Sequence, residues 1–432
     1  MPEVFENHFN AFGKQVSDYY ELLRLDPSYR VYFGEDDYMD VPANLEELKA
    51  LFESLEPGSS EKLEKFLEEA AYKYKVGMED LVHKPALKLG EFVDMRILTS
   101  MFKMDLFQSV SSHVRKYFKN PRLIQLLEFP VLFLGAAAAN IPALYTLMNY
   151  ADISLGTWYP MGGMHEIIKA MKALAEELGV KFVTGAPVEE IRVRSGKSTG
   201  ITVDNEFLPF DGVIGAGDYH AMEQDLLSEK HRNYSKTYWD KKKMAPSCLL
   251  FYLGVDAKIP NLEHHNLMFD ADFNMHSDEI YSEPKWPTNP LFYVCAPSKT
   301  DPSVAPEGKE NLFLLIPIAP GLHDSEGIRE RYYDLVMNRL EKLTGTEIKS
   351  KVIYKRSYAI DDFVKDYRAF KGNAYGLANT LDQTAIFKPS IRNKKVKNLF
   401  YTGQLTVPGP GVPPSIISGE VVANEFNKQL QL

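Results

Sequence analysis

Apolar residues in the first 150 positions recur mainly at three- and four-residue intervals, which predicts helices. Asn44 stands as a capping residue before the first such stretch, at residues 45–55. A second helix is expected from residue 60 to about residue 74, and further apolar, aromatic-rich segments cover 101–118 and 123–134. The N-terminal third of the chain is therefore expected to be mostly helical.

The pattern changes at residues 159–163, where the run Tyr-Pro-Met-Gly-Gly precedes a helical stretch that ends at Gly179. Short strand-like runs follow, with a Ser-Gly pair at residues 195–196 that predicts a hairpin turn. The predicted strands are residues 181–184, 188–193, 200–203 and 212–216. A helix, a strand, a hairpin and another strand in this order predict an α/β layer.

Strand-like runs dominate between residues 247 and 358, interrupted by one amphipathic helix at 325–343. The last segment returns to α/β character, with a buried strand at 398–402, a Gly/Pro-rich turn at 403–414 and a helix at 415–430. Two α/β blocks separated by a β-rich insert predict a discontinuous domain. In open α/β sheets, ligands bind beyond the carboxyl ends of the strands.

The composition is that of an ordinary globular chain. Of 432 residues, 45% are hydrophobic and 25% are charged, and the formal net charge is −10. That acidic balance disfavours a nucleic-acid partner, whose phosphates need basic residues. The most apolar stretch, residues 129–139, is too short to cross a bilayer, and no basic leader opens the chain. Cys248 and Cys295 are too few for a disulfide framework, which predicts a cytoplasmic protein.

The glycine-rich turn at residues 403–415 is the strongest local candidate for a ligand site. Such a turn between a strand and a helix lets backbone N–H groups approach an anion at the positive end of the helix. It lacks the Gly-Lys-Ser/Thr of a phosphate-binding loop, and Pro414 stands where a dinucleotide fingerprint has its third glycine. From the pattern alone, a cofactor site and a plain structural turn both stay open, as they do at Gly162 and Gly163.

Side chains that could perform catalysis by themselves are not evident in the sequence. There is no Gly-x-Ser-x-Gly elbow, and the histidines, including the pair His264-His265, have no metal-ligand spacing. We therefore predict no metal site and assign no catalytic side chain. Two glycine-rich turns without a reactive side chain suggest that a bound cofactor supplies the chemistry.

Several segments together resemble the bacterial carotenoid (phytoene) desaturase family of FAD-dependent, amine-oxidase-like flavoproteins. The similarity extends along the whole chain in the order of the family. The resembling segments are residues 159–164, 174–180, 296–308, 376–377, 383–385 and 403–419. The resemblance implies an α/β fold with a discontinuous, Rossmann-like FAD-binding domain and a substrate domain made of a β-sheet and helices.

The resemblance also implies where each part lies. Residues 1–155 would form a helical substrate and membrane-associated region, 156–232 and 386–432 the two FAD-domain segments, and 233–385 a β-rich substrate domain. FAD would lie along the turn and helix at 403–419, with the Val188 backbone beside the adenine. The implied cofactor contacts are Gly403, Gln404, Gly409, Gly411, Val412, Pro413, Ser415, Gly419, Val188, Ala216 and Asp218.

One feature of the family is not found in this sequence. Members begin with a βαβ unit that carries a Gly-x-Gly-x-x-Gly turn for the FAD pyrophosphate, and residues 1–5 correspond to sequence just after it. We expect that the coding sequence starts upstream, the alternative being a genuine fragment. In either case the chain as given is expected to bind FAD weakly and to have little activity.

The activity that the resemblance implies is desaturation of a linear carotenoid precursor, phytoene, toward lycopene. The substrate would be a long-chain isoprenoid taken from a membrane surface by a peripherally associated protein, and a quinone or oxygen would accept the electrons. Three alternatives stay open: a hydroxycarotenoid 3,4-desaturase, a dehydrosqualene desaturase, and a non-catalytic isoprenoid-binding protein.

Overall fold

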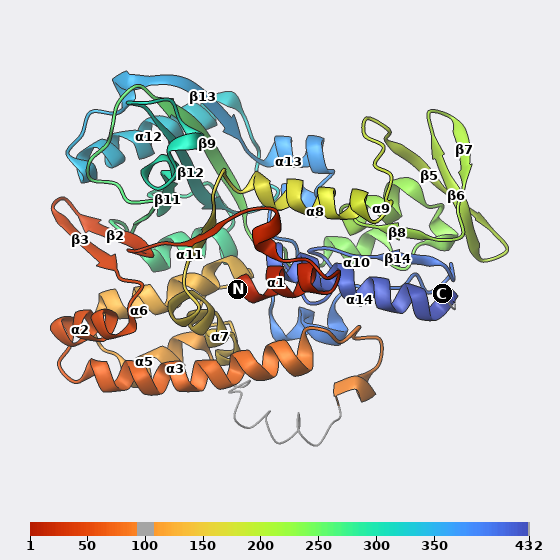
Figure 1. Cartoon of the computed structure of the whole chain (residues 1–432), viewed down its shortest axis with the longest axis horizontal. Coiled ribbons are helices and arrows are strands. Elements are labelled where there is room, and N and C mark those ends of the chain that lie inside the picture. Colours follow the sequence, from red (N-terminus) through yellow and green to blue (C-terminus); the bar gives the residue numbers. More distant parts are fainter. Residues whose placement is uncertain (93–107, 431–432) are drawn as a thin grey trace.

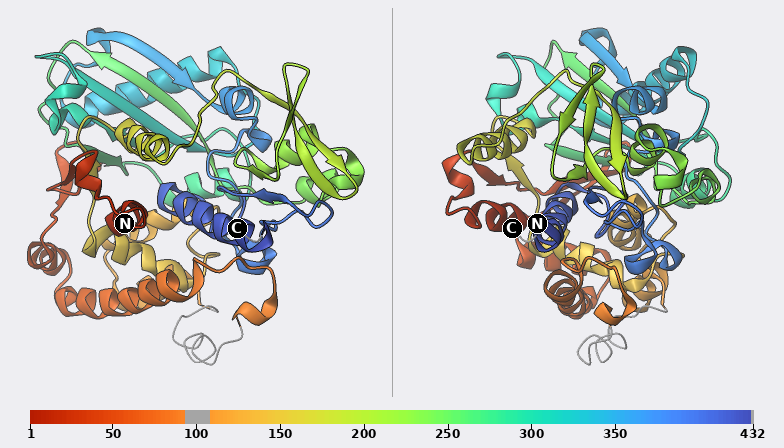
Figure 2. Two further views of the ribbon diagram at one scale, coloured as in Figure 1. Left: turned by 45° about the vertical axis from the view of Figure 1, so that its right-hand side comes forward. Right: turned by 90° about the vertical axis from the view of Figure 1, so that its right-hand side faces the viewer.

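The computed structural model describes residues 1–92 and 108–430 (Figure 1). A seven-stranded sheet, a group of helices and an α/β part make up the molecule, and Figure 2 shows the same three parts from two further sides. The mixed α/β class predicted from the sequence is confirmed. Within the described residues, no helix is long and apolar enough to cross a membrane.

The helices of the N-terminal third pack against one face of the sheet through a large apolar core. Phe52, Phe66 and Phe118 meet edge to face at its centre, with ring centroids 5.6 and 6.0 Å apart. Asn44 caps the first helix of this group as predicted, because its Oδ1 accepts the N–H of Glu46 at 2.8 Å. These helices are α2 (Leu45–Leu55), α3 (Ser59–Val76), α5 (Val110–Tyr117), α6 (Pro121–Glu128) and α7 (Leu147–Asn149). Positions 101–107 of the predicted segment lie outside the described residues.

The sheet has the strand order β13-β9-β12-β11-β10-β2-β3. Its strands are β2 (Tyr29–Gly34), β3 (Asp37–Val41), β9 (Ser247–Val255), β10 (His265–Met268), β11 (Phe292–Cys295), β12 (Glu310–Ile318) and β13 (Val352–Tyr358). The hairpin β2–β3 was not predicted. β2 is buried on both faces, so it lacks the alternation of polar and apolar residues that reveals a half-buried strand.

One face of the sheet is covered by α12 (Glu326–Thr344). The N-terminal helices cover the opposite face at β2 and β10, and that face keeps accessible surface at β9 and β12. On β12, Leu312 and Leu314 are buried toward α12, whereas Phe313 and Leu315 on the other face are only partly buried. The strand registers place side chains of β9, β11 and β10 on that same face: Leu250 and Tyr252, Tyr293 and Cys295, and His265. We call this the open sheet face; its residues are Tyr252, His265, Tyr293, Cys295, Phe313 and Leu315, with the buried Leu250 among them.

The α/β part contains the parallel pair β8 (Val213–Gly215) and β14 (Leu399–Tyr401), which match the strands predicted at 212–216 and 398–402. An antiparallel sheet of β5 (Val188–Arg194), β6 (Lys197–Val203) and β7 (Glu206–Pro209) projects beside it (Figure 1). The helices of this part are α8 (His165–Glu177), α9 (Tyr219–Leu226), α10 (Lys236–Asp240) and α14 (Val412–Leu430). Two further helices are α11 (Phe273–Tyr281) and α13 (Ile360–Tyr367).

Residues 181–184 do not form the strand that the sequence predicted. They are exposed and unpaired, and Val183 retains 79% of its accessible surface. A strand needs a neighbour to accept and donate its backbone hydrogen bonds, and none of the described residues provides one here.

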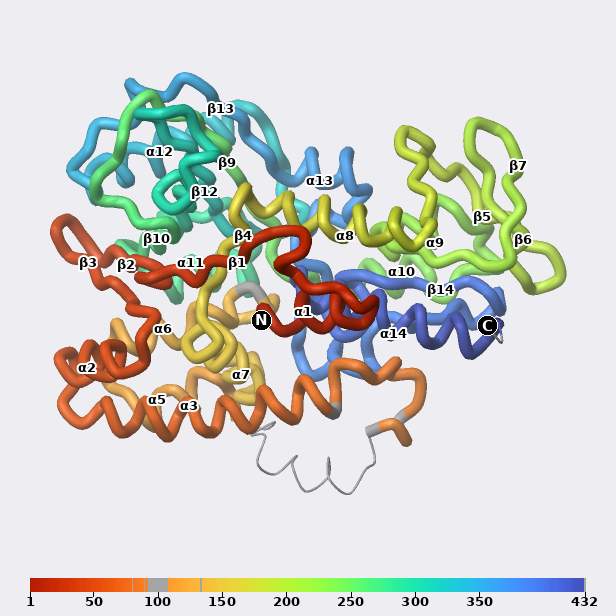
Figure 3. Tube along the Cα trace, in the orientation of Figure 1, coloured from red at the N-terminus to blue at the C-terminus, as the bar shows by residue number. Residues whose placement is uncertain are grey.

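The N-terminus lies against the α/β part. Helix α1 (Pro2–Asn10) packs beside α14, with Val4 in the same apolar cluster as Ile417. After α1 the chain forms β1 (Leu22–Arg24), which pairs with β4 (Trp158–Pro160). Figure 3 shows the chain passing from the helical region through β4 to α8, and the Gly162-Gly163 turn lies in the chain between these two elements.

Candidate functional site

The Gly/Pro-rich turn follows β14 and leads into α14, and Ser418 holds its first half in place. The Ser418 hydroxyl accepts the Gly403 N–H at 3.1 Å and lies 2.9 Å from the hydroxyl of Thr402 and 3.1 Å from that of Thr406. The turn is therefore tied to the second turn of the helix that follows it, which fixes the direction of its backbone groups.

Glycine is required in this turn by the backbone conformation. Gly403, Gly409 and Gly411 have φ values of 108°, 141° and 114°, which side-chain-bearing residues rarely adopt. A Cβ on Gly403 would lie 3.8 Å from the Ala216 carbonyl oxygen, so the ends of β14 and β8 meet here. Gly411 and Val412 are exposed at the start of the 19-residue helix α14. The result is an open backbone surface at the positive end of a helix, a place suited to an anionic ligand.

The other residues of the turn and helix that were predicted to contact the cofactor lie in different surroundings. Ser415 is engaged locally, because its hydroxyl donates to the Gly411 carbonyl at 2.8 Å. The Gln404 amide donates to Asn373 Oδ1 at 3.2 Å. Gly419 has no atom within 4 Å of the place where a Cβ would stand. The cofactor roles of these residues, and that of the half-buried Pro413, stay predictions.

Val188 and Asp218 both lie beside the β8–β14 pair. Val188 packs on the apolar cluster that contains Leu399 and Tyr401. Asp218 caps α9 through the Ala221 N–H at 3.1 Å and accepts the Phe370 N–H at 3.1 Å. Burial raises the pKa of Asp218, and these backbone donors oppose that rise. Asp218 thus has a clear structural role, and the structure brings it, Ala216 and Gly403 to one end of the parallel pair.

Asp301 was not singled out from the sequence, yet it joins two segments that carry the resemblance. Its Oδ2 accepts the Gly162 N–H at 2.7 Å and the Tyr159 hydroxyl at 3.2 Å, while Oδ1 accepts the Ser303 hydroxyl at 2.6 Å. Burial alone would raise its pKa, but these donors outweigh burial and lower it. Asp301 therefore fixes the Gly162-Gly163 turn against the β-sheet part.

A polar cluster on the open sheet face also escaped sequence reasoning. The cross-strand pair His265–Cys295 joins β10 to β11, and ligand-type atoms of His264, His265 and Cys295 lie within 4.8 Å of one another. Neither spacing along the chain nor any motif indicates this set, because the strand register creates it. Such atoms could hold a metal ion, but burial raises the pKa of Cys295 to about 11, which disfavours the thiolate that a metal needs.

Hydrogen bonds already engage one nitrogen of each histidine in this cluster. His264 Nδ1 lies 2.8 Å from the Thr300 hydroxyl, and His265 Nδ1 lies 2.5 Å from the Tyr293 hydroxyl. Burial lowers the pKa of His264 to about 4 and that of His265 to about 3, so both rings are neutral near pH 7. The cluster thus offers neutral hydrogen-bonding groups on an otherwise largely apolar face.

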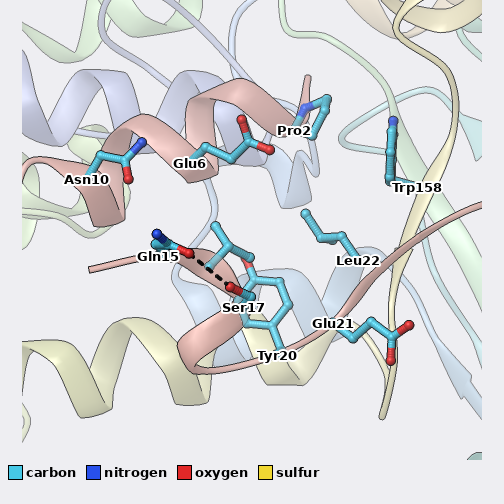
Figure 4. A pocket seen from close by; sticks show the side chains of 10 residues that line it. Pro2, Glu6, Asn10, Gln15, Ser17, Tyr20, Glu21, Leu22 and Trp158 are labelled. Atoms are coloured by element: carbon cyan, nitrogen blue, oxygen red, sulfur yellow. Dashed lines mark hydrogen bonds between the residues drawn. The ribbon is translucent and has the colours of Figure 1, made fainter. Parts of the chain in front are cut away.

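A cavity of about 560 Å³ lies between α1, β1 and β4 (Figure 4). Pro2, Glu6 and Asn10 line it from α1, and Trp158 lines it from β4. Its two carboxylates, Glu6 and Glu21, would repel a phosphate and would lose hydration beside a polyene. We therefore place neither the cofactor nor the substrate there.

Comparison with known proteins agrees with this geometry. The family model described as flavin containing amine oxidoreductase matches residues 10–426. A carotenoid 3,4-desaturase from Haloarcula japonica is 41% identical over 424 residues, which cover 98% of this chain and 86% of that protein. A zeta-carotene-forming phytoene desaturase from Myxococcus xanthus is 32% identical, covering 99% of this chain and 83% of that protein.

The chain belongs to the flavin-containing amine oxidoreductase family. Both of these curated relatives are carotenoid desaturases, so the resemblance stated from the sequence is confirmed, as is FAD as the cofactor. Among solved structures, an oxidoreductase from Methanosarcina mazei superposes with a TM-score of 0.61 at 15% identity, covering 94% of this chain and 82% of that one. Putrescine oxidase bound to putrescine superposes with a TM-score of 0.55 at 9% identity, covering 100% and 86%. These likenesses establish the flavoenzyme fold.

The residues at the turn fit a flavin nucleotide. The glycines leave backbone open to a ligand, and α14 directs its positive end toward it. Two buried polar atoms beside Gly409, Lys388 Nζ and Asn379 Oδ1, have no hydrogen-bond partner in the described part of the chain. Unsatisfied buried groups of this kind are rare unless a ligand completes them.

Proposed function

We propose that this member of the flavin-containing amine oxidoreductase family desaturates a linear carotenoid. The observation that carries the proposal is the similarity to carotenoid desaturases over nearly the whole chain, at 41% identity to one of them. Two structural features support it. The turn at residues 403–411 offers a backbone cradle, and the open sheet face offers accessible aromatic and aliphatic side chains for a long hydrocarbon.

The reaction removes two hydrogens from neighbouring carbons and leaves a double bond between them. FAD, when bound, takes one hydrogen with its electron pair, and the other leaves as a proton. Tyr252, Phe313 and Leu315 would bind the chain of the substrate and exclude water from it. Asp301 would keep the Gly162-Gly163 turn in position between the sheet and the α/β part. A quinone or oxygen would then accept the electrons.

The observations favour carotenoid 3,4-desaturation as the specific reaction. The relative with that activity in its name is 41% identical, against 32% for the phytoene desaturase. The polar groups of His265 and Tyr293 on the open sheet face also suit a substrate with a hydroxyl group near one end.

Desaturation of phytoene toward lycopene is the second candidate. The relative from Myxococcus xanthus, which forms zeta-carotene from phytoene, supports it over 99% of the chain. For either substrate we propose a peripheral position on the membrane, because carotenoids dissolve in the hydrocarbon of the bilayer.

The test is conversion of defined substrates by the purified chain with added FAD. Liposomes would carry phytoene, a hydroxylated linear carotenoid or dehydrosqualene, and product would be followed by the red shift of polyene absorption and by chromatography. Conversion of the hydroxylated carotenoid alone supports 3,4-desaturation, and conversion of phytoene alone supports the second candidate. A chain that binds FAD but converts none of the three contradicts the proposed activity. A chain that binds the carotenoids but no FAD indicates a non-catalytic isoprenoid-binding protein.

A further inference from the structure

Lys388 is a buried amine without a hydrogen-bond partner in the part of the chain that the structure describes. Only 5% of its surface is accessible, and Nζ makes no hydrogen bond there. Burial, with the charge of Lys242 adding to it, lowers its pKa to about 7. Placing an unpaired amine in the interior costs several kcal/mol. Buried ionisable groups that destabilise the fold in this way are concentrated at functional sites.

The amine faces the Gly/Pro-rich turn. A Cβ built on Gly409 would lie 3.5 Å from Lys388 Nζ and 3.4 Å from Asn379 Oδ1. Asn379 is 3% accessible, and its Oδ1 also lacks a partner among the described atoms. A cationic donor and a neutral acceptor therefore converge on the same glycine, which is itself buried.

The segment that carries both side chains is held in place by hydrogen bonds. The Gln383 amide donates to the carbonyl oxygens of Lys243 at 2.8 Å and Ala378 at 3.2 Å. The Asn379 N–H donates to the Leu134 carbonyl at 2.7 Å. The two unpartnered atoms are thus positioned before any ligand arrives, which is how binding sites reduce the entropy cost of binding.

The hydrocarbon chain of a carotenoid cannot complete this pair, because it has neither an acceptor for an ammonium group nor a donor for an amide oxygen. The flavin can, since its ring system carries carbonyl oxygens that accept from an ammonium group and a ring N–H that donates to an amide oxygen, and it gains negative charge on reduction. We propose that Lys388 and Asn379 hold the flavin ring system against the Gly409 turn, and that the charge of Lys388 favours the reduced cofactor. This inference rests on the proposed function.

The experiment compares Lys388→Met and Lys388→Arg with a matched control, Lys243→Met. Lys243 is an exposed neighbour paired with Asp382 at 3.9 Å. Two quantities are measured on the full chain: FAD affinity by quenching of flavin fluorescence, and the midpoint potential of the bound FAD. Thermal unfolding of each apoprotein shows that it is folded, and Lys388→Met should be no less stable than wild type because it removes an unpaired buried amine.

We expect Lys388→Met to weaken FAD binding about tenfold, the loss typical of one charge-assisted hydrogen bond. The reduced-to-oxidised equilibrium should fall at least tenfold, which is about 30 mV for two electrons. Lys388→Arg should retain both properties, and Lys243→Met should match wild type. Unchanged affinity and potential in Lys388→Met, or equal losses in Lys388→Arg, would overturn the inference while leaving the proposed function standing. A wild-type chain that binds no FAD would defeat both.

Discussion

The backbone N–H of Gly162 donates to Oδ2 of Asp301 at 2.7 Å, across 139 positions of sequence. This bond joins the turn before α8 to the loop after β11. Asp301→Ala removes it together with the bonds from Tyr159 and Ser303. We expect a loss of about 2–4 kcal/mol in the free energy of unfolding, because hydrogen bonds to a charged acceptor are among the stronger ones.

Urea unfolding measures this loss. Asp301→Asn keeps the shape of the side chain and one acceptor oxygen, so its free energy of unfolding should lie between those of wild type and Asp301→Ala. Because the pKa of Asp301 is lowered in the folded state, its contribution is present above the unfolded pKa and is lost as the pH falls through the folded pKa. Wild type should therefore lose stability more steeply than Asp301→Asn below about pH 4. An Asp301→Ala protein as stable as wild type would contradict this role.

The sequence predicted the elements whose pattern is local. The helix at 325–343 shows regular periodicity, and the structure has it as α12. The prediction of a strand at 181–184 was wrong, because a sequence pattern typical of a strand does not provide the neighbouring strand with which it must pair. β2 was missed because burial on both faces removes the alternation.

The residues of the candidate site divide in the same way, into those with a local sequence pattern and those that only the fold brings together. The turn at 403–415 was recognisable because its glycines and prolines are consecutive, and the motifs gave the family. Asp301 and the pair His265–Cys295 were not recognisable, because strand register and long-range hydrogen bonds bring them to their partners. Lys388 is one lysine among many in the sequence, and only its burial in the fold distinguishes it.

Gly411→Ala and Gly419→Ala should have opposite effects. Gly411 has a φ of 114°, and a Cβ there would lie 3.2 Å from Pro414 Cδ, so alanine strains the turn by about 1–3 kcal/mol. FAD affinity should fall about tenfold or more. Gly419 lies within α14 with open space around it, so alanine should stabilise the protein by about 0.5–1 kcal/mol and leave FAD binding unchanged.

Thermal unfolding and FAD titration of both variants test this pair. Weaker FAD binding in Gly419→Ala would show that Gly419 touches the cofactor, as the family resemblance implied. Undiminished FAD binding in Gly411→Ala would show that the turn is not the cofactor site.

Tyr293→Phe and His265→Leu should change substrate preference rather than general activity. They remove the polar pair on the open sheet face and keep its shape and apolar character. With a hydroxylated carotenoid, kcat/KM should fall about tenfold, the loss of one hydrogen bond to a substrate hydroxyl. With phytoene it should stay the same or rise. Phe313→Leu, on the same face, serves as the apolar control, and equal losses on both substrates would contradict hydroxyl recognition.

The pH dependence of apoprotein stability provides a test of Lys388 that needs neither FAD nor substrate. Its folded pKa of about 7 is below the usual lysine value of about 10.4, so between these two pH values the unfolded chain binds one more proton than the folded one. Stability therefore rises with pH across this window, by up to about 1.4 kcal/mol per pH unit from this group alone. Lys388→Met should lack this contribution, and its stability advantage over wild type should be largest at or below pH 7 and shrink toward pH 10.

Urea unfolding of both proteins at several pH values measures the difference in slope, with Lys243→Met as the control. Parallel curves for wild type and Lys388→Met would show that the amine is solvated or paired in solution, which contradicts the burial described here.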